Sequence, residues 1–466
     1  MTGLTQRLTD FVSDFTPEDV PDGVAATVKL ALLDTLGVAC LSAAGEPGDR
    51  SPAPGTGSGP ATLIGHPDTV TAAAAAFGNG ALIHALDFDD TGASTGHPSS
   101  TLIPAGLATC EELGRDGRDF ITAYVVGYEV GAVLSKVIRL DRPFHRTSVV
   151  GPLAAAAACA WLRGMRGPAV RDALGVAAVM GGSGIRQSFG TTLKPLQVGF
   201  AARVGVEAPV LAAAGWIGDA EILESPHGFV AGYSAGSVLH DPEAVDQLGV
   251  RLAIASQDAS RGVLGGPPTM KPWACCAGNF ATLLAVAQAT GGRPYAPQDV
   301  AEIRVIAITD PEAGALMRPE PRNGLEAKFS LRYTVAAALL DGEVRLDTYD
   351  DDQFARITAS GMPQRVTVVP STPLPDSERF AVEVELTDGR VLRGSSDGRR
   401  GLPAEPSDVL AKFRRISGGL LAPEAITAVL ERVDSFESTP VNAVTELFRT
   451  GKRTGREDRT LARPWS

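Results

Sequence analysis

The chain has few of the residues that build disulfide or metal frameworks. Its 466 residues include five cysteines and six histidines. The cysteines form no C-x-x-C pair and stand mostly in apolar, helix-like segments, where reduced structural cysteine is usual. An iron–sulfur cluster needs about three well-placed thiolates, and the neighbouring pair Cys275 and Cys276 does not easily supply them. A disulfide framework, a structural zinc and an iron–sulfur cluster are therefore not expected.

Positive charge is scarce as well. Lysine and arginine number 42 against 54 aspartates and glutamates, which gives a net charge of −12. No nucleic-acid partner is expected from this balance, and an anionic substrate would need lysines or arginines gathered locally. The N-terminal stretch MTGLTQRLTDFVSDF lacks the apolar core of a signal peptide, and charges or glycines interrupt the alanine-rich segments. We therefore expect no membrane span and a cytoplasmic location.

Length and periodicity predict a mainly α fold with two domains. A chain of 466 residues is too long for one ordinary core. Apolar residues recur at helical spacing from 21 to 45 and in several segments between 69 and 214, which predicts an all-helical domain over residues 1–265. Helical patterns return after residue 398. We expect residues 399–466 to pack back on the first domain.

Strand patterns mark the intervening segment. EIRVIAIT and QRVTVV are rich in β-branched residues, and RFAVEVELTDGRVLRGSS alternates on both sides of Asp388-Gly389. A D-G pair between alternating segments is a strong hairpin signal. Residues 324–342 carry a helical pattern. Residues 266–398 are therefore predicted to form a smaller α/β domain, inserted in the helical domain as a lid.

The densest group of chemically useful side chains lies in GNGALIHALDFDDTGASTGHPSS, residues 78–100. Asp87 and Thr91 are spaced i, i+4, so they share one face if the preceding helix continues through them, with His84 three residues before Asp87. His97 precedes a proline, which favours an extended backbone there. This composition indicates acid–base or carboxylate chemistry, although a solvated acidic surface has the same appearance.

A metal site is the other interpretation of this stretch. It would draw on His84, Asp87, Asp89 and Asp90, but their spacing matches no standard ligand motif. No metal and no cofactor are therefore predicted.

Four further places carry polar groups with little obvious structural work. His145 stands in FHRTS before an alanine-rich segment, and Lys194 precedes a proline in a glycine-bounded loop. Lys271 repeats the Lys-Pro pattern, while Lys328 and Tyr333 lie in KFSLRYTVA. Each has an ordinary alternative: a capping or core histidine, a surface lysine, a core tyrosine.

The order and spacing of several segments resemble the MmgE/PrpD family over nearly the whole chain. The segments are GNGALIHALDFDDT…GHPSS, GYEV at 127–130, FHRTS with GPLAAAAA, GTTLKPLQVGFAARVGVEAPVLAAAG, EILESPHGF, KPWACC and KFSLRYTVA. The family includes 2-methylcitrate dehydratases, cis-aconitate decarboxylases and iminodisuccinate epimerases. The resemblance implies a helical domain built from both chain ends, an inserted α/β lid, and a cofactor-free site between this domain and the lid. It also implies a homodimer.

Matching this chain to the family pattern implies a set of site residues. Catalytic roles fall to Asp87, His97, His145 and Tyr333, and substrate-binding roles to Thr91, Lys194 and Lys271. Lysines would bind substrate carboxylates, histidines would carry protons, and Asp87 would orient a histidine and favour its protonated form.

The chain also departs from that pattern. Gln197 and Phe280 stand where histidines are expected, and DFDD replaces a WND-like sequence. Both positions are therefore predicted to affect specificity, towards a polycarboxylate with fewer carboxylates or a more apolar group. The leading expectation is a lyase that dehydrates a 2-methylcitrate-like hydroxy acid. The alternatives are decarboxylation of a cis-aconitate-like acid, epimerisation of an amino-dicarboxylate such as iminodisuccinate, and a non-catalytic binding or assembly role.

Overall fold

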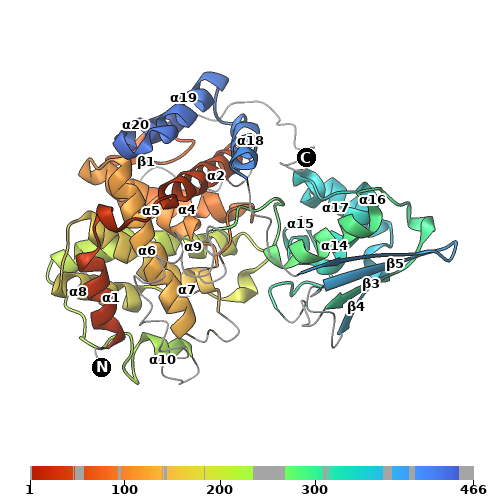
Figure 1. The fold of residues 1–466 in the computed structure, drawn as a ribbon, viewed down its shortest axis with the longest axis horizontal. Helices are drawn as coiled ribbons and strands as arrows, with labels where there is room; N and C mark the ends of the chain where they lie inside the picture. The colour runs from red at the N-terminus through yellow and green to blue at the C-terminus, as the bar shows by residue number, and fades with distance from the viewer. Residues whose placement is uncertain are drawn as a thin grey trace. The chain divides into compact units, whose positions relative to one another are not determined.

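The chain folds as two units, which Figure 1 traces in the computed structural model. The structure describes residues 3–45, 47, 57–92, 96–138, 140, 144–182, 184–234, 268–307, 312, 314–370, 380–397 and 405–450. The helical unit comprises Met1–Gln187, Lys194–Met270 and Glu405–Gly455, and the small unit comprises Ser188–Leu193, Lys271–Ala404 and Arg456–Ser466. The predicted boundaries at 265/266 and 398/399 lie outside the described residues.

The helical unit contains the helices that apolar periodicity predicts and three that it did not, α1, α10 and α20. They are α1 (Leu4–Asp14), α2 (Val24–Ala44), α4 (Ala72–Ala85), α5 (Ser99–Leu113), α6 (Gly117–Val137), α7 (Arg146–Leu162), α8 (Pro168–Met180), α9 (Leu193–Ala213), α10 (Phe229–Tyr233), α18 (Pro406–Ser417), α19 (Pro423–Asp434) and α20 (Val441–Thr445). A short antiparallel pair, β1 (Ser58–Thr62) with β2 (Thr69–Val70), was not expected. The mainly α class is confirmed.

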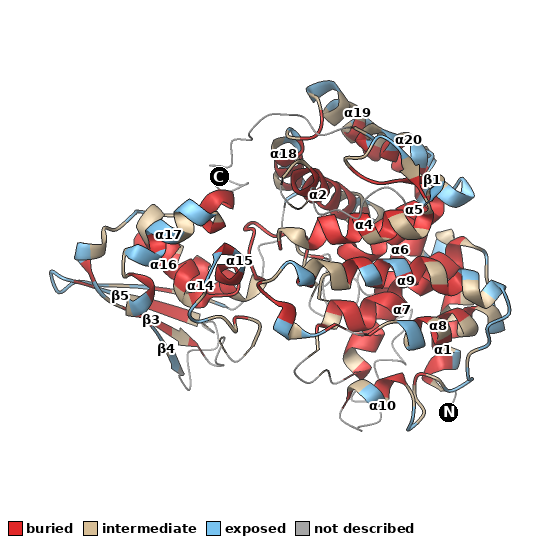
Figure 2. Ribbon diagram, turned by 180° about the vertical axis from the view of Figure 1, so that it is seen from behind, coloured by how far each residue is buried: buried red, intermediate tan, exposed pale blue. Residues whose placement is uncertain are grey.

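Small residues let these helices pack closely. Helix α6 packs on α7, α4 on α5, and α2 on the C-terminal helix α18. At Gly37 in α2, an added Cβ would lie 3.1 Å from side-chain atoms of Phe413 and Ile416 in α18, which is tighter than an ordinary contact. Figure 2 shows the buried faces along α2, α5, α6 and α7. The two chain ends therefore share one core.

Three described helices are long and apolar enough to cross a membrane by length and composition: α2, α6 and α9. This corrects the expectation that charges and glycines keep all such segments short. In the structure, 72%, 94% and 56% of their apolar windows are buried within the protein. The apolar surface of α2 and α6 thus serves mainly the packing of the helical unit.

The small unit is a four-stranded sheet covered on one face by helices (Figure 1). The strands are β3 (Val300–Ala307), β4 (Val366–Pro370), β5 (Phe380–Leu386) and β6 (Val391–Ser396), in the order β4-β3-β5-β6. Only the β3–β4 pairing is parallel. The predicted hairpin is confirmed, because β5 pairs with β6 around Gly389, whose φ is 87°.

The helices of the small unit are α14 (Phe280–Thr290), α15 (Gly324–Ala327), α16 (Leu331–Asp341) and α17 (Asp351–Ala359). The single helix expected over residues 324–342 is two helices. The Ser330 side chain caps the second of them by accepting a hydrogen bond from the Tyr333 amide at 3.2 Å. Serine at this position favours a new helix start, because its hydroxyl replaces a missing intrahelical partner.

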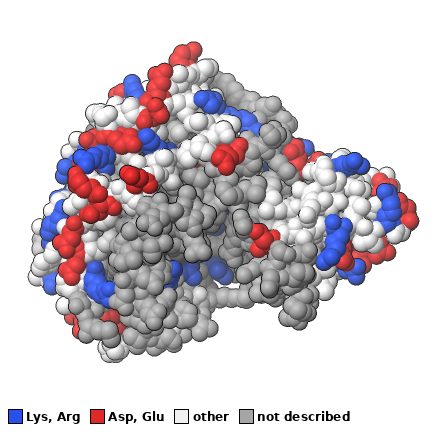
Figure 3. Space-filling view, in the orientation of Figure 1, with Lys and Arg blue, Asp and Glu red and all other residues white. Residues whose placement is uncertain are grey.

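Charged side chains of both signs are interspersed on the face that Figure 3 draws. Over the described part of that face, lysines and arginines do not gather into a basic patch.

Candidate active site

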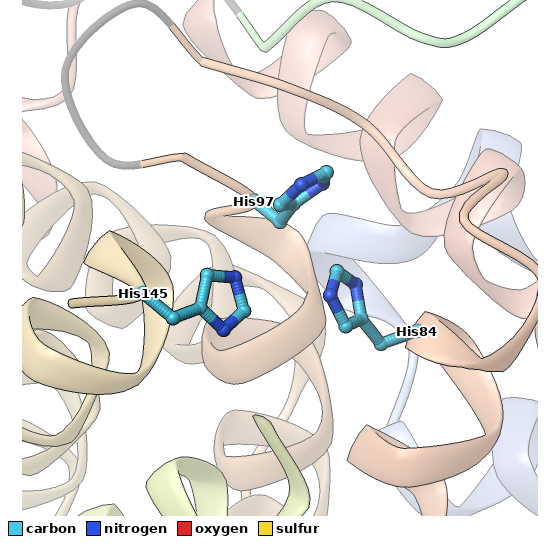
Figure 4. A group of neighbouring side chains, drawn as sticks. All are labelled: His84, His97 and His145. Atoms are coloured by element: carbon cyan, nitrogen blue, oxygen red, sulfur yellow. The ribbon is translucent and has the colours of Figure 1, made fainter. Parts of the chain in front are cut away.

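Three histidines from distant parts of the chain meet inside the helical unit (Figure 4). His84 lies in the last turn of α4, His97 just before α5, and His145 at the N-cap of α7. Their ring centroids are 4.6 Å apart for His84 and His97, 5.6 Å for His84 and His145, and 6.4 Å for His97 and His145. Histidine side chains this close can pass protons to one bound molecule.

Asp87 sits at a sharp turn after α4. The helix ends at Ala85, and Asp87 has φ of 53°, so among the described non-glycine residues it alone adopts the left-handed conformation. Aspartate tolerates this conformation better than most residues. The expectation that Asp87 and Thr91 share a helical face is therefore wrong. Thr91 instead exchanges two backbone hydrogen bonds of 2.8 Å with Thr269.

Lys194 brings a positive charge into this group. It lies in the first turn of α9 rather than in the predicted loop, and it is 4% exposed. Its Nζ donates to Asp87 Oδ1 at 2.9 Å and contacts His84 Nε2 at 2.6 Å. An ammonium group can only donate, so His84 Nε2 must accept and the ring proton must sit on Nδ1.

The other side of His84 agrees with that tautomer. Its Nδ1 lies 2.8 Å from Asp89 Oδ2. Burial lowers the pKa of His84 to about 4, with the charge of Lys194 adding to the effect and that of Asp89 opposing it. His84 is therefore neutral at pH 7. It links the Lys194 ammonium to the Asp89 carboxylate.

Of these three histidines, His97 is the most open to a ligand. Its side chain is 16% exposed, whereas that of His84 is fully buried. The Nδ1 atom lies 2.8 Å from the Asp90 carbonyl oxygen and 3.4 Å from Asp89 Oδ2. A carbonyl only accepts, so Nδ1 carries the proton and Nε2 is the nitrogen that can exchange a proton with a substrate.

His145 is 4% exposed and stacks on His84. Burial, followed by the positive charge of Lys194, holds its pKa well below the ordinary value, while a hydrogen bond with Gln197 acts in the opposite direction. Gln197 also donates to the Ile185 carbonyl at 3.1 Å. The structure therefore places Gln197 beside the histidines, where its predicted effect on specificity can be tested.

The two aspartates after Phe88 are in opposite charge states. Burial would raise the pKa of Asp89, but the imidazoles of His84 and His97 outweigh it and hold that pKa well below the usual range. Burial raises the pKa of Asp90 to about 8, although hydrogen bonds from Ser99 oppose the shift. At pH 7 the site thus contains a charged Asp89 beside a neutral Asp90 and the neutral imidazoles of His84 and His145.

Ligand atoms of His84, His97 and His145 all lie within 4.8 Å of one another, as do those of His84, Asp87, Asp89 and His97. Distance alone would allow a metal ion. Both ring nitrogens of His84 are engaged, however, and one of them faces the Lys194 ammonium at 2.6 Å. A cation held at that point repels a divalent ion, so these residues fit proton transfer and anion binding better than a resident metal.

The remaining predicted residues belong to the small unit. Lys271 is fully buried and donates to the Cys275 carbonyl at 3.3 Å. Tyr333 donates its hydroxyl to the Thr348 carbonyl at 2.6 Å, and its ring packs between Tyr349 and Phe354. Burial raises the pKa of Tyr333 well above its usual value.

Phe280 is also part of the core of the small unit, where its ring centroid lies 5.2 Å from that of Trp273. The contacts of Tyr333 and Phe280 are those of core residues. Their predicted roles at the site stay predictions.

The predicted set omitted His84 and Asp89, which the geometry places at its centre. Both stood in the conspicuous stretch 78–100, but periodicity could not show that His84 bridges Lys194 and Asp89, 110 and 5 residues away. A histidine three residues before Asp87, an aspartate predicted to be catalytic, was the available signal.

The fold and the site define the class of protein: the chain belongs to the MmgE/PrpD family. The MmgE/PrpD N-terminal domain model matches residues 6–241 and the C-terminal domain model matches residues 273–435.

Among curated relatives, the chain is similar to proteins named cis-aconitate decarboxylase. It is 28% identical to the one from Mus musculus over 94% of this chain and 91% of the relative. It is 29% identical to the one from Homo sapiens over 81% and 79%, and 25% identical to one from Aspergillus terreus over 90% of each. Lyases are therefore the enzyme class that these similarities support.

Proposed function

We propose that this protein is a carboxy-lyase that decarboxylates cis-aconitate or a closely related unsaturated tricarboxylate without a metal or organic cofactor. The observation that carries the proposal is the Lys194 ammonium, fixed between Asp87 and His84, with the partly exposed ring of His97 packed against His84. The named relatives, which match over most of both chains, favour decarboxylation over the dehydration of a methylcitrate-like acid that the sequence placed first.

The reaction asks two things of these residues. When the C–CO2 bond breaks, its electron pair passes into the conjugated system next to a remaining carboxylate, and a cation at that carboxylate stabilises the developing charge. Lys194 supplies that cation. A carbon atom must then receive one proton, giving a five-carbon unsaturated dicarboxylate and CO2.

His97 is suited to deliver that proton. Its Nδ1 proton is held by the Asp90 carbonyl at 2.8 Å, which leaves Nε2 to face a ligand. Carboxylates bound nearby favour the imidazolium form of the ring, so binding itself prepares the acid. His145 and Gln197 would line the same space.

The homodimer that the family resemblance implies belongs to this proposal too.

The test incubates purified protein with cis-aconitate, 2-methylcitrate and iminodisuccinate in D2O. We expect CO2 release equal to the cis-aconitate consumed, with one solvent deuterium in the product. Loss of water from 2-methylcitrate with no CO2 from cis-aconitate would replace decarboxylation by dehydration. No turnover of any acid, despite tight binding of one, would favour a non-catalytic role.

A further inference from the structure

Another buried lysine lies next to the site but outside every role described above. Lys412, in α18, is fully buried and its Nζ lies 2.7 Å from Asp34 Oδ1 in α2, whose side chain is fully buried too. The same Nζ donates to the Phe88 carbonyl oxygen at 3.0 Å and lies 3.7 Å from the centroid of the Phe88 ring. One ammonium group thus holds Phe88 by its backbone and by its side chain.

Phe88 joins the two aspartates that organise the site. Asp87, before it, pairs with Lys194, and Asp89, after it, contacts His84 and His97. Asp87 also has the unfavourable φ of 53°. A residue persists in such a conformation only where its surroundings over-determine it. The contacts of Lys412 with Phe88 supply that constraint from α18.

We propose that Lys412 is a positioning residue for the reaction: with Asp34 it clamps Phe88, and this clamp fixes the directions in which Asp87 and Asp89 point. The inference rests on the proposed function, because it assigns the clamp to that site. Lys412 itself is 0% exposed and contacts Phe88 between the two aspartates, so it acts through them.

The test has to separate positioning from stability, because removing one partner of a buried ion pair destabilises a fold. Replacing both partners by apolar residues of similar volume is often neutral. The central variant is therefore Lys412→Met with Asp34→Leu. Lys29→Met is the matched control: Lys29 also extends from α2 to the C-terminal segment, bonding Asp434 O at 2.9 Å and Glu437 at 3.1 Å, but it does not contact Phe88.

We expect the double variant to melt near the wild-type temperature while its kcat on cis-aconitate falls about ten- to hundredfold, since a displacement near 1 Å can lower a rate by about that factor. KM should change less, and Lys29→Met should keep the wild-type kcat. A double variant with both wild-type stability and wild-type kcat overturns the proposal. If it fails to fold, Phe88→Leu carries the test, since it keeps the ion pair and removes only the ring. We expect at least a fivefold fall in kcat there, and an unchanged kcat overturns the proposal.

Imidazole 15N spectra of histidine-labelled protein test the clamp without any substrate. The double variant should shift the ring nitrogen signals of His84 and His97, and Lys29→Met should leave them in place. This measurement decides the matter if the wild type turns over none of the acids, an outcome that would count against the proposed function alone. Unchanged His84 and His97 signals in the double variant overturn the clamp.

Discussion

Burial shifts the pKa values of two neighbours of Asp89, Asp90 and His84, in opposite directions. It raises the pKa of Asp90 to about 8 and lowers the pKa of His84 to about 4. Both shifts favour the neutral form, because a buried charge loses its hydration. At pH 7 both groups are therefore uncharged, and Asp89 between them keeps its negative charge through the two imidazoles. The same residues then make the stability of the protein depend on pH.

Asp90→Asn should become more stable relative to wild type as pH rises. Folded Asp90 holds its proton up to about pH 8, whereas the unfolded side chain releases it near 3.8. Wild type therefore loses stability from this group as pH increases through that window, by up to about 1.4 kcal/mol per unit. The asparagine variant has no such loss, and the histidine contributions are common to both proteins. Urea unfolding at pH 5, 6 and 7 measures the difference, and a constant difference would contradict the assignment.

His97→Gln should lower kcat by about 10²–10⁴-fold, the usual contribution of a general acid or base. Glutamine keeps a polar side chain but cannot deliver a proton. His227, an exposed histidine, provides the control, because His227→Ala should leave kcat unchanged. Circular dichroism checks that both variants fold. A His97→Gln enzyme with nearly full kcat removes this residue from the proton transfer.

Binding of a polycarboxylate at pH 7 should take up a proton. Burial and the charge of Lys194 keep the pKa of His145 well below its ordinary value, so the ring is neutral before binding. Carboxylates nearby raise the pKa again. Titration calorimetry in two buffers with different ionisation enthalpies measures the uptake, up to about one proton per site. Equal heats in both buffers would show that His145 stays neutral.

At the scale of elements, the sequence predicts helices well and turns poorly. Most helices of the large unit follow from apolar residues at helical spacing, because burial is what stabilises them. The turn at Asp87 could not be read from spacing, since Asp87, with its φ of 53°, bonds Lys194, and the next residue, Phe88, bonds Lys412 of α18, both far along the chain. Asp87 and Thr91 therefore do not share a helical face, because the chain leaves the helix at Ala85.

The candidate site shows the same division. The family resemblance supplied Asp87, His97, His145 and Lys194, and all four lie in the helical unit. It did not supply His84, whose importance lies in contacts made 110 residues along the chain. Long-range contacts of this kind are invisible to periodicity.

Gly394→Ala tests how closely α14 lies on the sheet of the small unit. A Cβ at Gly394 would stand 2.1 Å from the Ala285 carbonyl oxygen in α14, so the helix or the strand must move. We expect a loss of about 1–3 kcal/mol in the free energy of unfolding, the range for overpacking. Gly418→Ala is the control, because its nearest neighbour would be 3.9 Å away and its φ is −61°. Urea denaturation compares the two, and equal stability would mean that α14 can shift without penalty.

At the scale of the whole molecule, activity should survive complete removal of metal ions. The three clustered histidines lie close enough together to hold a metal ion, but His84 already bonds Lys194 and Asp89. Dialysis against a strong chelator, with residual metal checked by mass spectrometry, should leave kcat unchanged. Activity that disappears and returns only with one added divalent ion would overturn the cofactor-free proposal.

The contact between Lys412 and Phe88 can form only late in the synthesis of the chain. The two residues are 324 positions apart, which corresponds to about 15–65 s of synthesis at roughly 5–20 residues per second. Throughout that interval the nascent chain carries Asp34 and the apolar flank of α2 without α18, which covers Gly37 in the finished protein. The packing of α2, one of the first helices to emerge, is therefore complete only when α18, one of the last, has been synthesised. A chaperone that shields α2 during elongation would improve the yield of folded protein.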